Sequence, residues 1–157
     1  MRCLRCAESG ATSGPRTLLL CNEPLRVQDA AAFMEDLNAG LDPAVPPFNQ
    51  VTLNWYATGN EFLPYHVDWL CGSPPGAVVS SVTLAPPGVP ARDFVLKPTV
   101  EERSNALADR FIIPTRNGTV VTLGGKALTA YRHSVPPSPG HQAPRINASF
   151  RSFATSP

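Results

Sequence analysis

Two histidines and one aspartate are the residues of this sequence whose types and spacing point most directly to chemistry. His66 and Asp68 are separated by one residue, and such neighbours in a β-strand point to the same side. His133 lies 67 positions beyond His66. Two imidazoles and one carboxylate form the facial triad that binds Fe(II) and leaves coordination positions open, although zinc accepts the same ligands. The alternative for His66 and Asp68 is a surface ion pair.

A second informative segment is the strand predicted from Arg145 to Phe153. Arg145, Asn147, Ser149 and Arg151 alternate with apolar residues, so one face of the strand is polar and carries two arginines and no acid. If this face points to solvent, the segment is an edge strand. If it points into a barrel, the buried guanidinium groups need an anionic partner. A dicarboxylate co-substrate would provide one, because a guanidinium binds a carboxylate bidentately.

The composition favours one domain made of many short elements. The 157 residues match the size of a single domain, and a hydrophobic content of 43% is enough to fill one core. Eighteen prolines and eleven glycines, scattered along the chain, exclude collagen and long helical bundles. We therefore expect a mainly β fold, in which residues 1–48 form an N-terminal arm and helix and residues 49–157 form the core.

Changes in the hydrophobic period predict where these elements lie. One amphipathic helix, capped by Asp29 and ended by Gly40, is indicated by the stripe Ala30, Phe33, Met34 and Leu37. From residue 51 the period drops to two, which places Asn54 and Tyr56 on the same face of a strand. Further strands are predicted at 64–70, 77–85, 93–96, 110–114, 119–123, 128–133 and 145–153. About eight strands after the helix indicate a jelly roll or barrel, and residues 1–28 are expected to form an irregular arm.

Charge and cysteine usage limit the partners and the compartment. Residues 1–91 hold four arginines and eight acidic residues, whereas residues 92–157 hold nine basic and four acidic ones, so a polyanion should meet the C-terminal part. The sequence has no run of ~18 apolar residues and no secretory signal, so we expect an intracellular protein, cytoplasmic or nuclear, without a membrane partner. Its cysteines should then be reduced. Cys3 and Cys6 lack the second pair of a zinc site, although Cys21 could be a third ligand.

The order and spacing of six motifs between about Asn49 and Phe153 resemble the AlkB-like dioxygenases that depend on 2-oxoglutarate and Fe(II). The motifs are Asn54-x-Tyr56, His66-x-Asp68, Val79 to Leu84, Gly118 to Val121, His133 and Arg145 to Arg151. The resemblance implies a double-stranded β-helix with one or two N-terminal helices. It also implies Fe(II), 2-oxoglutarate as co-substrate and dioxygen as oxidant. An N-methyl group oxidised in this way is lost as formaldehyde.

The resemblance assigns a role to each matching residue. His66, Asp68 and His133 are similar to the iron ligands of the family. Arg145, aided by the Tyr56 hydroxyl, is similar to the residue that pairs with the distal carboxylate of 2-oxoglutarate. Asn54 and Asn147 resemble the donors to the proximal end of the co-substrate. Arg151 resembles the second arginine of the family, which lies near the co-substrate and could hold Asp68 in place.

Two departures from the family pattern bear on the substrate. In the DNA-repair members the residues after the aspartate ligand are acidic and one helps to read the flipped base, whereas here they are Trp69 and Leu70. The triplet His66-Val67-Asp68 and the run Ile113 to Val121 are more similar to the branch that demethylates N6-methyladenine in RNA. Only about fifty residues precede Asn49, so the nucleotide-recognition lid is expected to be reduced or missing, which favours single-stranded substrate.

Several aromatic and basic side chains are candidates for substrate binding. Tyr65 and Trp69 flank the iron ligands and could stack on a base, with rim packing as the alternative. Six basic residues could contact phosphates or simply form a solvated face: Arg92, Lys97, Arg103, Arg116, Lys126 and Arg132. Of these, Arg132 adjoins His133 and is the candidate for a substrate contact. His141, in the proline-rich loop 136–144, is expected to be exposed and without a role.

The sequence leaves three functions open. The leading hypothesis is an oxygenase that demethylates a methylated base in RNA or single-stranded DNA. The first alternative is a hydroxylase on the same fold that acts on a protein side chain or a small molecule. The second is a non-catalytic jelly-roll binding module, against which the complete set of iron-ligand residues argues.

Overall fold

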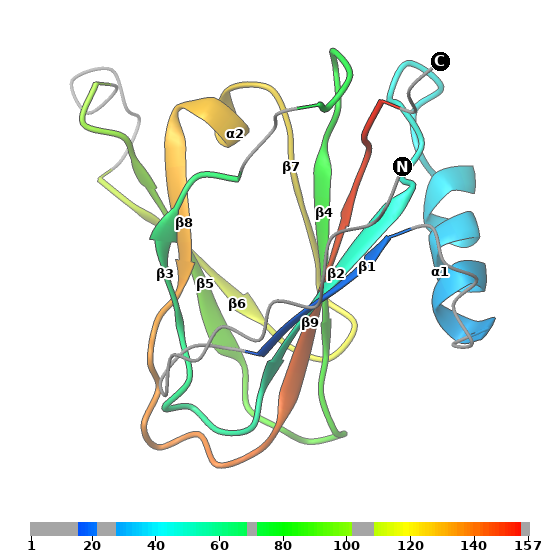
Figure 1. Cartoon of the computed structure of the whole chain (residues 1–157). Helices are drawn as coiled ribbons and strands as arrows, with labels where there is room; N and C mark the ends of the chain where they lie inside the picture. Colours follow the sequence, from blue (N-terminus) through cyan, green and yellow to red (C-terminus); the bar gives the residue numbers. More distant parts are fainter. Residues whose placement is uncertain (1–15, 22–27, 69–71, 102–108, 155–157) are drawn as a thin grey trace.

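In the part of the chain that the structure describes, nine strands form two antiparallel sheets that face each other (Figure 1). The structure, a computed structural model, describes residues 16–21, 28–68, 72–101 and 109–154. The five-stranded sheet has the order β1-β2-β9-β4-β7 and the four-stranded sheet the order β3-β8-β5-β6. The strands are β1 (Arg16–Cys21), β2 (Gln50–Tyr56), β3 (Leu63–His66), β4 (Val79–Leu84), β5 (Arg92–Pro98), β6 (Phe111–Thr115), β7 (Val120–Leu123), β8 (Tyr131–Val135) and β9 (Arg145–Arg151). This is the mainly β jelly-roll architecture predicted from the sequence.

Helix α1 (Gln28–Ala39) covers the outer side of the five-stranded sheet (Figure 1). Met34 and Leu37 of the helix pack against a cluster that contains Phe48, Val51 and Phe150. The predicted helix is confirmed, but it begins at Gln28, so Asp29 lies inside its first turn instead of before it. Gly40 follows the last turn and donates its backbone N–H to the carbonyls of Asp36 and Leu37. Among the described residues, α1 is the single helix before β2, and it lies between β1 and β2 in the chain.

A second core fills the space between the two sheets. Its buried members are Tyr56, Val79, Phe94, Leu96, Val121, Leu123, Leu128 and Val135. These residues come from β2, β4 and β7 of one sheet and from β5 and β8 of the other. Leu128 belongs to the short helix α2 (Lys126–Thr129). The strand predicted over 128–133 is therefore wrong at its start, because a short apolar run does not by itself distinguish a helical turn from a strand.

Three further expectations about the elements need correction. Part of the arm expected to be irregular forms β1, which pairs along its whole length with β2. The strand predicted over 64–70 ends at His66. The edge-strand interpretation of residues 145–153 is wrong, because β9 lies between β2 and β4 in the middle of its sheet. The polar face of β9 points to the space between the sheets, and its apolar residues Ala148 and Phe150 belong to the cluster on the side of α1.

Removing the Phe150 ring tests the outer core. Phe150 is 1% exposed and lies within 5.7 Å of the Phe33 ring and 6.1 Å of the Phe48 ring, measured between ring centroids. We expect Phe150→Ala to lower the free energy of unfolding by roughly 3–5 kcal/mol, because it removes buried area and leaves a cavity. Urea denaturation measures this. Ile112→Ala, at a position 47% exposed, is the control and should change stability by less than about 1 kcal/mol.

Candidate metal centre and adjoining pocket

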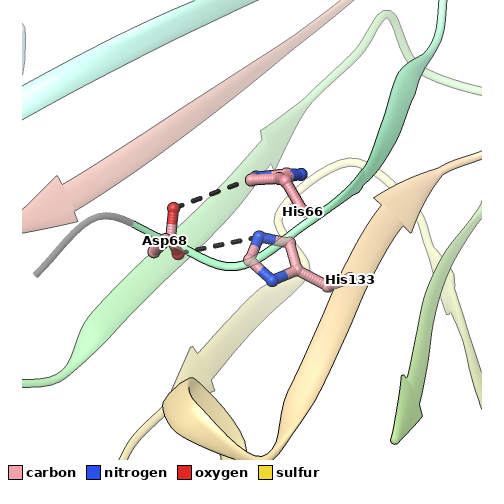
Figure 2. A group of neighbouring side chains, drawn as sticks. All are labelled: His66, Asp68 and His133. Atoms are coloured by element: carbon pink, nitrogen blue, oxygen red, sulfur yellow. Dashed lines mark ion pairs between the residues drawn. The ribbon is translucent and has the colours of Figure 1, made fainter. Parts of the chain in front are cut away.

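His66, Asp68 and His133 come together at one end of the space between the sheets (Figure 2). One donor atom of each lies within 4.8 Å of the others. Nε2 of His66 is 3.9 Å from Oδ1 of Asp68, and Nε2 of His133 is 3.6 Å from Oδ2. Both distances are too long for hydrogen bonds. Donors that share one ion lie roughly 3 Å apart, so the three groups would have to approach one another by up to about 2 Å on binding. The group could therefore hold a metal ion.

A β-bulge brings the two histidines side by side. β3 pairs with β8 through Leu63 opposite Val135, and the register then shifts so that His66 stands opposite His133. Without the extra residue in β3, Tyr65 would occupy that position. Bulges of this kind re-aim side chains beside functional sites. The His66 and His133 ring centroids are consequently only 4.2 Å apart.

Neighbouring groups orient each of the three donors. The Nδ1–H of His66 donates to the carbonyl of Pro64 at 2.9 Å, which leaves the lone pair of Nε2 facing Asp68. The ring of His133 stacks on Phe94, with the centroids 5.3 Å apart. Arg151 donates from Nη2 to Oδ1 of Asp68 at 2.6 Å. The expected contact between Arg151 and Asp68 is present.

Burial keeps the His133 imidazole neutral. Desolvation is the largest effect and lowers the pKa of His133 from 6.5 to about 4. The Asp68 carboxylate opposes the shift, and His66 and Arg151 add to it. A neutral imidazole is the form that binds a metal. Asp68 itself is 9% exposed, which excludes the surface ion pair considered for His66 and Asp68.

A polar surface runs from this group along the inner faces of β2, β9 and β4. The register sets Asn54 opposite Asn147 and Tyr56 opposite Arg145. Ser81 donates its hydroxyl to Oδ1 of Asn147 at 2.8 Å, and Ser149 donates to the same atom at 3.1 Å. These two hydrogen bonds fix the orientation of the Asn147 amide.

Arg145 and Tyr56 lie along the same face with buried polar atoms that make no hydrogen bond. Arg145 is 3% exposed and donates from Nη2 to the Thr83 hydroxyl, but its Nε and Nη1 have no partner. The hydroxyl of Tyr56 likewise has no partner. Burial raises the pKa of Tyr56 to about 12 and lowers the pKa of Arg145 to about 10, so near neutral pH the phenol is neutral and the guanidinium charged. Buried polar groups nearly always have a hydrogen-bond partner, so these unpaired atoms call for an explanation such as a bound ligand.

A cavity of about 40 Å³ adjoins the side chains of His66, Asp68 and His133 and this polar surface. Seven of the thirteen residues around it were singled out individually from the sequence: the three metal-site residues, Asn54, Asn147, Ser149 and Arg151. The lining residues are Asn54, Leu63, His66, Asp68, Val79, Ser81, Phe94, Leu123, His133, Val135, Asn147, Ser149 and Arg151. The polar alternation of Ser81 and Thr83 in β4 was a signal that could have revealed both as inward-facing.

The candidates for substrate binding lie elsewhere or outside the described residues. Tyr65 and Arg132 each adjoin a histidine of the site in the chain, so strand alternation turns both side chains away from it. Nζ of Lys97 lies 3.8 Å from the centre of the Tyr65 ring, and Arg132 stands opposite Lys97 in the sheet. Their contact with substrate stays a prediction. Trp69, like Cys3, Cys6 and Arg103, lies outside the described residues, and for Cys21 only the backbone is described.

Two residues expected at the surface are buried. His141 is 8% exposed, and its backbone carbonyl accepts from the N–H of Gly59 at 2.6 Å, so the expectation of an exposed residue is wrong. Arg92 is 2% exposed and bonds to carbonyl groups, which excludes it from a solvated, phosphate-binding face. The neighbouring sequence of a histidine or an arginine gives no local signal that the side chain will be buried.

Comparisons with known proteins found a likeness to solved structures. No family model matches the chain, and no curated protein matches it. A solved structure described as "The structure of OsALKBH1" is similar over 80% of this chain, with 21% sequence identity and a TM-score of 0.48. This chain spans 62% of the length of that one. Among the described helices, none is long and apolar enough to cross a membrane.

The neutral state of His133 makes the stability of the metal-free protein depend on pH. The unfolded state takes up the proton at a higher pH than the folded state, so this contribution is complete above about pH 6.5 and is lost as the pH falls toward 4. We expect a loss of roughly 3 kcal/mol over this window. Urea denaturation at several pH values measures it. In His133→Gln the loss should shrink by most of that amount, and an unchanged pH profile would contradict the prediction.

The Arg151–Asp68 contact predicts an effect on metal affinity. Arg151→Met removes the group that holds Asp68, so Mn(II) should bind roughly 10–100-fold more weakly while the three donors remain. Titration calorimetry with Mn(II) measures this. Arg110→Met replaces an exposed arginine and serves as the control. Equal Mn(II) affinity in Arg151→Met and Arg110→Met would show that Arg151 does not support the site.

Proposed function

We propose that this chain is an Fe(II)- and 2-oxoglutarate-dependent dioxygenase of the AlkB type. One observation carries the proposal: a group of two imidazoles and one carboxylate shares an inner sheet face with a buried arginine that has unpaired donors. The two imidazoles and the carboxylate suit a redox-active metal with open coordination positions, and the buried arginine suits a carboxylate ligand. A co-substrate with a metal-chelating end and a distal carboxylate uses both. Residues 49–157 form the proposed catalytic core.

The donor set fits Fe(II). Two neutral imidazoles and a carboxylate from one face leave three positions for other ligands, which a closed tetrahedral structural site would not. His66, Asp68 and His133 would hold the ion. Arg151 would keep the carboxylate of Asp68 fixed in direction, since it donates to one of the two oxygens.

The unpaired groups fit the distal carboxylate of 2-oxoglutarate. Nε and Nη1 of Arg145 provide N–H donors that have no protein partner, and the neutral hydroxyl of Tyr56 provides a further donor. The co-substrate carboxylate would supply the charge partner that a buried guanidinium needs. Asn54 and Asn147 would bind the proximal end, with Ser81 and Ser149 setting the Asn147 amide.

The chain's contribution to the reaction is placement and exclusion of water. When bound together, Fe(II) and 2-oxoglutarate supply the activation of dioxygen that oxidises a substrate C–H bond and releases succinate and CO₂. The apolar wall around the site, from Phe94 on one sheet to Leu123 on the other, keeps bulk water from the reacting groups. Oxidation of an N-methyl group produces an N-hydroxymethyl group, which breaks down to formaldehyde and the free amine.

The proposed substrate is a methylated base in RNA or single-stranded DNA. Support comes from the family resemblance of the motifs and from the excess of basic residues in 92–157. The test incubates the Fe(II)-loaded protein with 2-oxoglutarate and an oligonucleotide carrying N6-methyladenine or N1-methyladenine, and measures succinate and formaldehyde. We expect both products in equal amounts. Succinate without formaldehyde from every methylated oligonucleotide, together with a hydroxylated peptide, would instead indicate the hydroxylase.

Two substitutions separate the metal from the co-substrate. His66→Ala should abolish metal-dependent binding of 2-oxoglutarate. Arg145→Met should weaken 2-oxoglutarate binding by roughly 100-fold or more, because it removes a charged hydrogen-bonding partner from a buried site, and it should leave Mn(II) affinity unchanged. Calorimetry with Mn(II) present measures both. Unaltered 2-oxoglutarate binding in His66→Ala would refute the proposed mechanism.

A further inference from the structure

Arg92 is a buried cation that the proposed reaction does not use. It is 2% exposed and lies on β5, across the barrel interior from the sheet that carries Arg145. Its guanidinium donates from Nη1 to the carbonyl of Thr58 at 3.3 Å. From Nη2 it donates to the carbonyls of Glu61 and Pro136, both at 2.9 Å. Three carbonyl groups satisfy hydrogen bonds but do not neutralise a charge.

These contacts hold together two loops, 57–62 and 136–144, which lie at one end of the barrel and are called the floor below. The loop 57–62 joins β2 to β3, and the loop 136–144 joins β8 to β9. Gly59 donates to the carbonyl of His141 at 2.6 Å and accepts from the N–H of Ser138 at 2.7 Å. A Cβ atom on Gly59 would lie 1.7 Å from the Ser138 carbonyl oxygen, so only glycine allows this approach. Arg92 thus anchors both loops at one end of the interior.

The same end holds Tyr56 and Arg145. The Arg92 guanidinium carbon is 5.3 Å from the centre of the Tyr56 ring, and that of Arg145 is 5.6 Å from it. Nε of Arg92 and Nε2 of the buried His141 have no hydrogen-bond partner, like Nε and Nη1 of Arg145. Among the residues that the structure describes, no carboxylate lies within ion-pair distance of either arginine. Arg92 and Arg145 therefore both lie against the Tyr56 ring, and neither is paired with a carboxylate of the described residues.

We propose that Arg92 is a second cation of the co-substrate pocket, which acts on the distal carboxylate without replacing Arg145 as its partner. This inference rests on the proposed function. Arg92 favours an anion beside Tyr56 because its field is weakly screened in the interior. It thereby raises the preference for a 2-oxo acid with a second carboxylate over one with an uncharged tail. Glu61 opposes this preference: it is the acid whose charge acts on Arg92, and its Oε2 accepts from the Thr58 N–H at 2.8 Å.

The test compares two ligands that differ only in the distal carboxylate. Binding of 2-oxoglutarate and of 2-oxovalerate is measured by calorimetry with saturating Mn(II). We expect Arg92→Met to weaken 2-oxoglutarate binding roughly tenfold or more and to leave 2-oxovalerate affinity within about threefold. Arg92→Lys keeps the charge and loses the three-carbonyl geometry, so it should retain most of the preference. Arg110→Met is the control for loss of an exposed arginine.

Glu61→Gln tests the same charge without removing Arg92, whose replacement could prevent folding. The amide oxygen can still accept from the Thr58 N–H, so the loop contact remains while the negative charge is lost. We expect 2-oxoglutarate to bind roughly threefold more tightly and 2-oxovalerate to bind as before.

The outcomes separate this inference from the proposed function. If wild-type protein with Mn(II) binds no 2-oxoglutarate, both fail. If wild-type protein binds it but Arg92→Met weakens the two ligands equally, Arg92 only holds the loops and the inference is overturned. An unchanged ligand preference in Glu61→Gln would also overturn it.

Discussion

The Asp68 carboxylate is the group on which the arrangement of the site depends. It follows β3 of the four-stranded sheet, and Arg151 of the five-stranded sheet holds one of its oxygens at 2.6 Å. This ion pair spans the two sheets where the metal group lies, so it fixes their separation at that end. The second oxygen of Asp68 is then turned toward His133. Breaking a buried pair of this kind is costly, because a charge is left without a partner.

The interior has two differently charged ends for a simple geometric reason. In β9 every second side chain points inward, so Arg151, Ser149, Asn147 and Arg145 lie in a row from the metal group to the floor. At the Arg151 end a carboxylate balances the guanidinium. At the Arg145 end no such balance exists among the described residues, and Arg92 adds a second positive charge there. A bifunctional anion suits an interior with this charge distribution better than a neutral ligand does.

The two loops of the floor are held in place by backbone hydrogen bonds, as strands are. The loop 136–144 contains four prolines, and its backbone exchanges hydrogen bonds with Gly59. Three carbonyl groups of the two loops converge near Arg92. Loops that carry buried polar groups need such partners, since an unpaired carbonyl in the interior is unfavourable. The position of His141 inside the protein follows from these loop contacts and not from its own polarity.

The sequence by itself determined the features that repeat with a local period. Alternation in β2 and β9 predicted which side chains share a face, and the helical stripe predicted α1. These outcomes depend on strand and helix geometry, which acts over a few residues. His66 and Asp68 do come together, but Asp68 lies beyond the end of β3, so strand alternation is not the reason. The assignment of roles to Arg145, Asn147 and Arg151 came from resemblance, and of the contacts it implies the structure shows the one between Arg151 and Asp68.

Only the tertiary structure decided the features that depend on residues distant in the chain. The pairing of β1 with β2, the central place of β9 and the bulge that sets His66 opposite His133 all depend on which strands become neighbours. The burial of Arg92 and His141 depends on two loops that meet beneath the barrel. Local sequence contains no signal for these events, because the free energy that favours them comes from burial and hydrogen bonding between segments that are brought together only on folding.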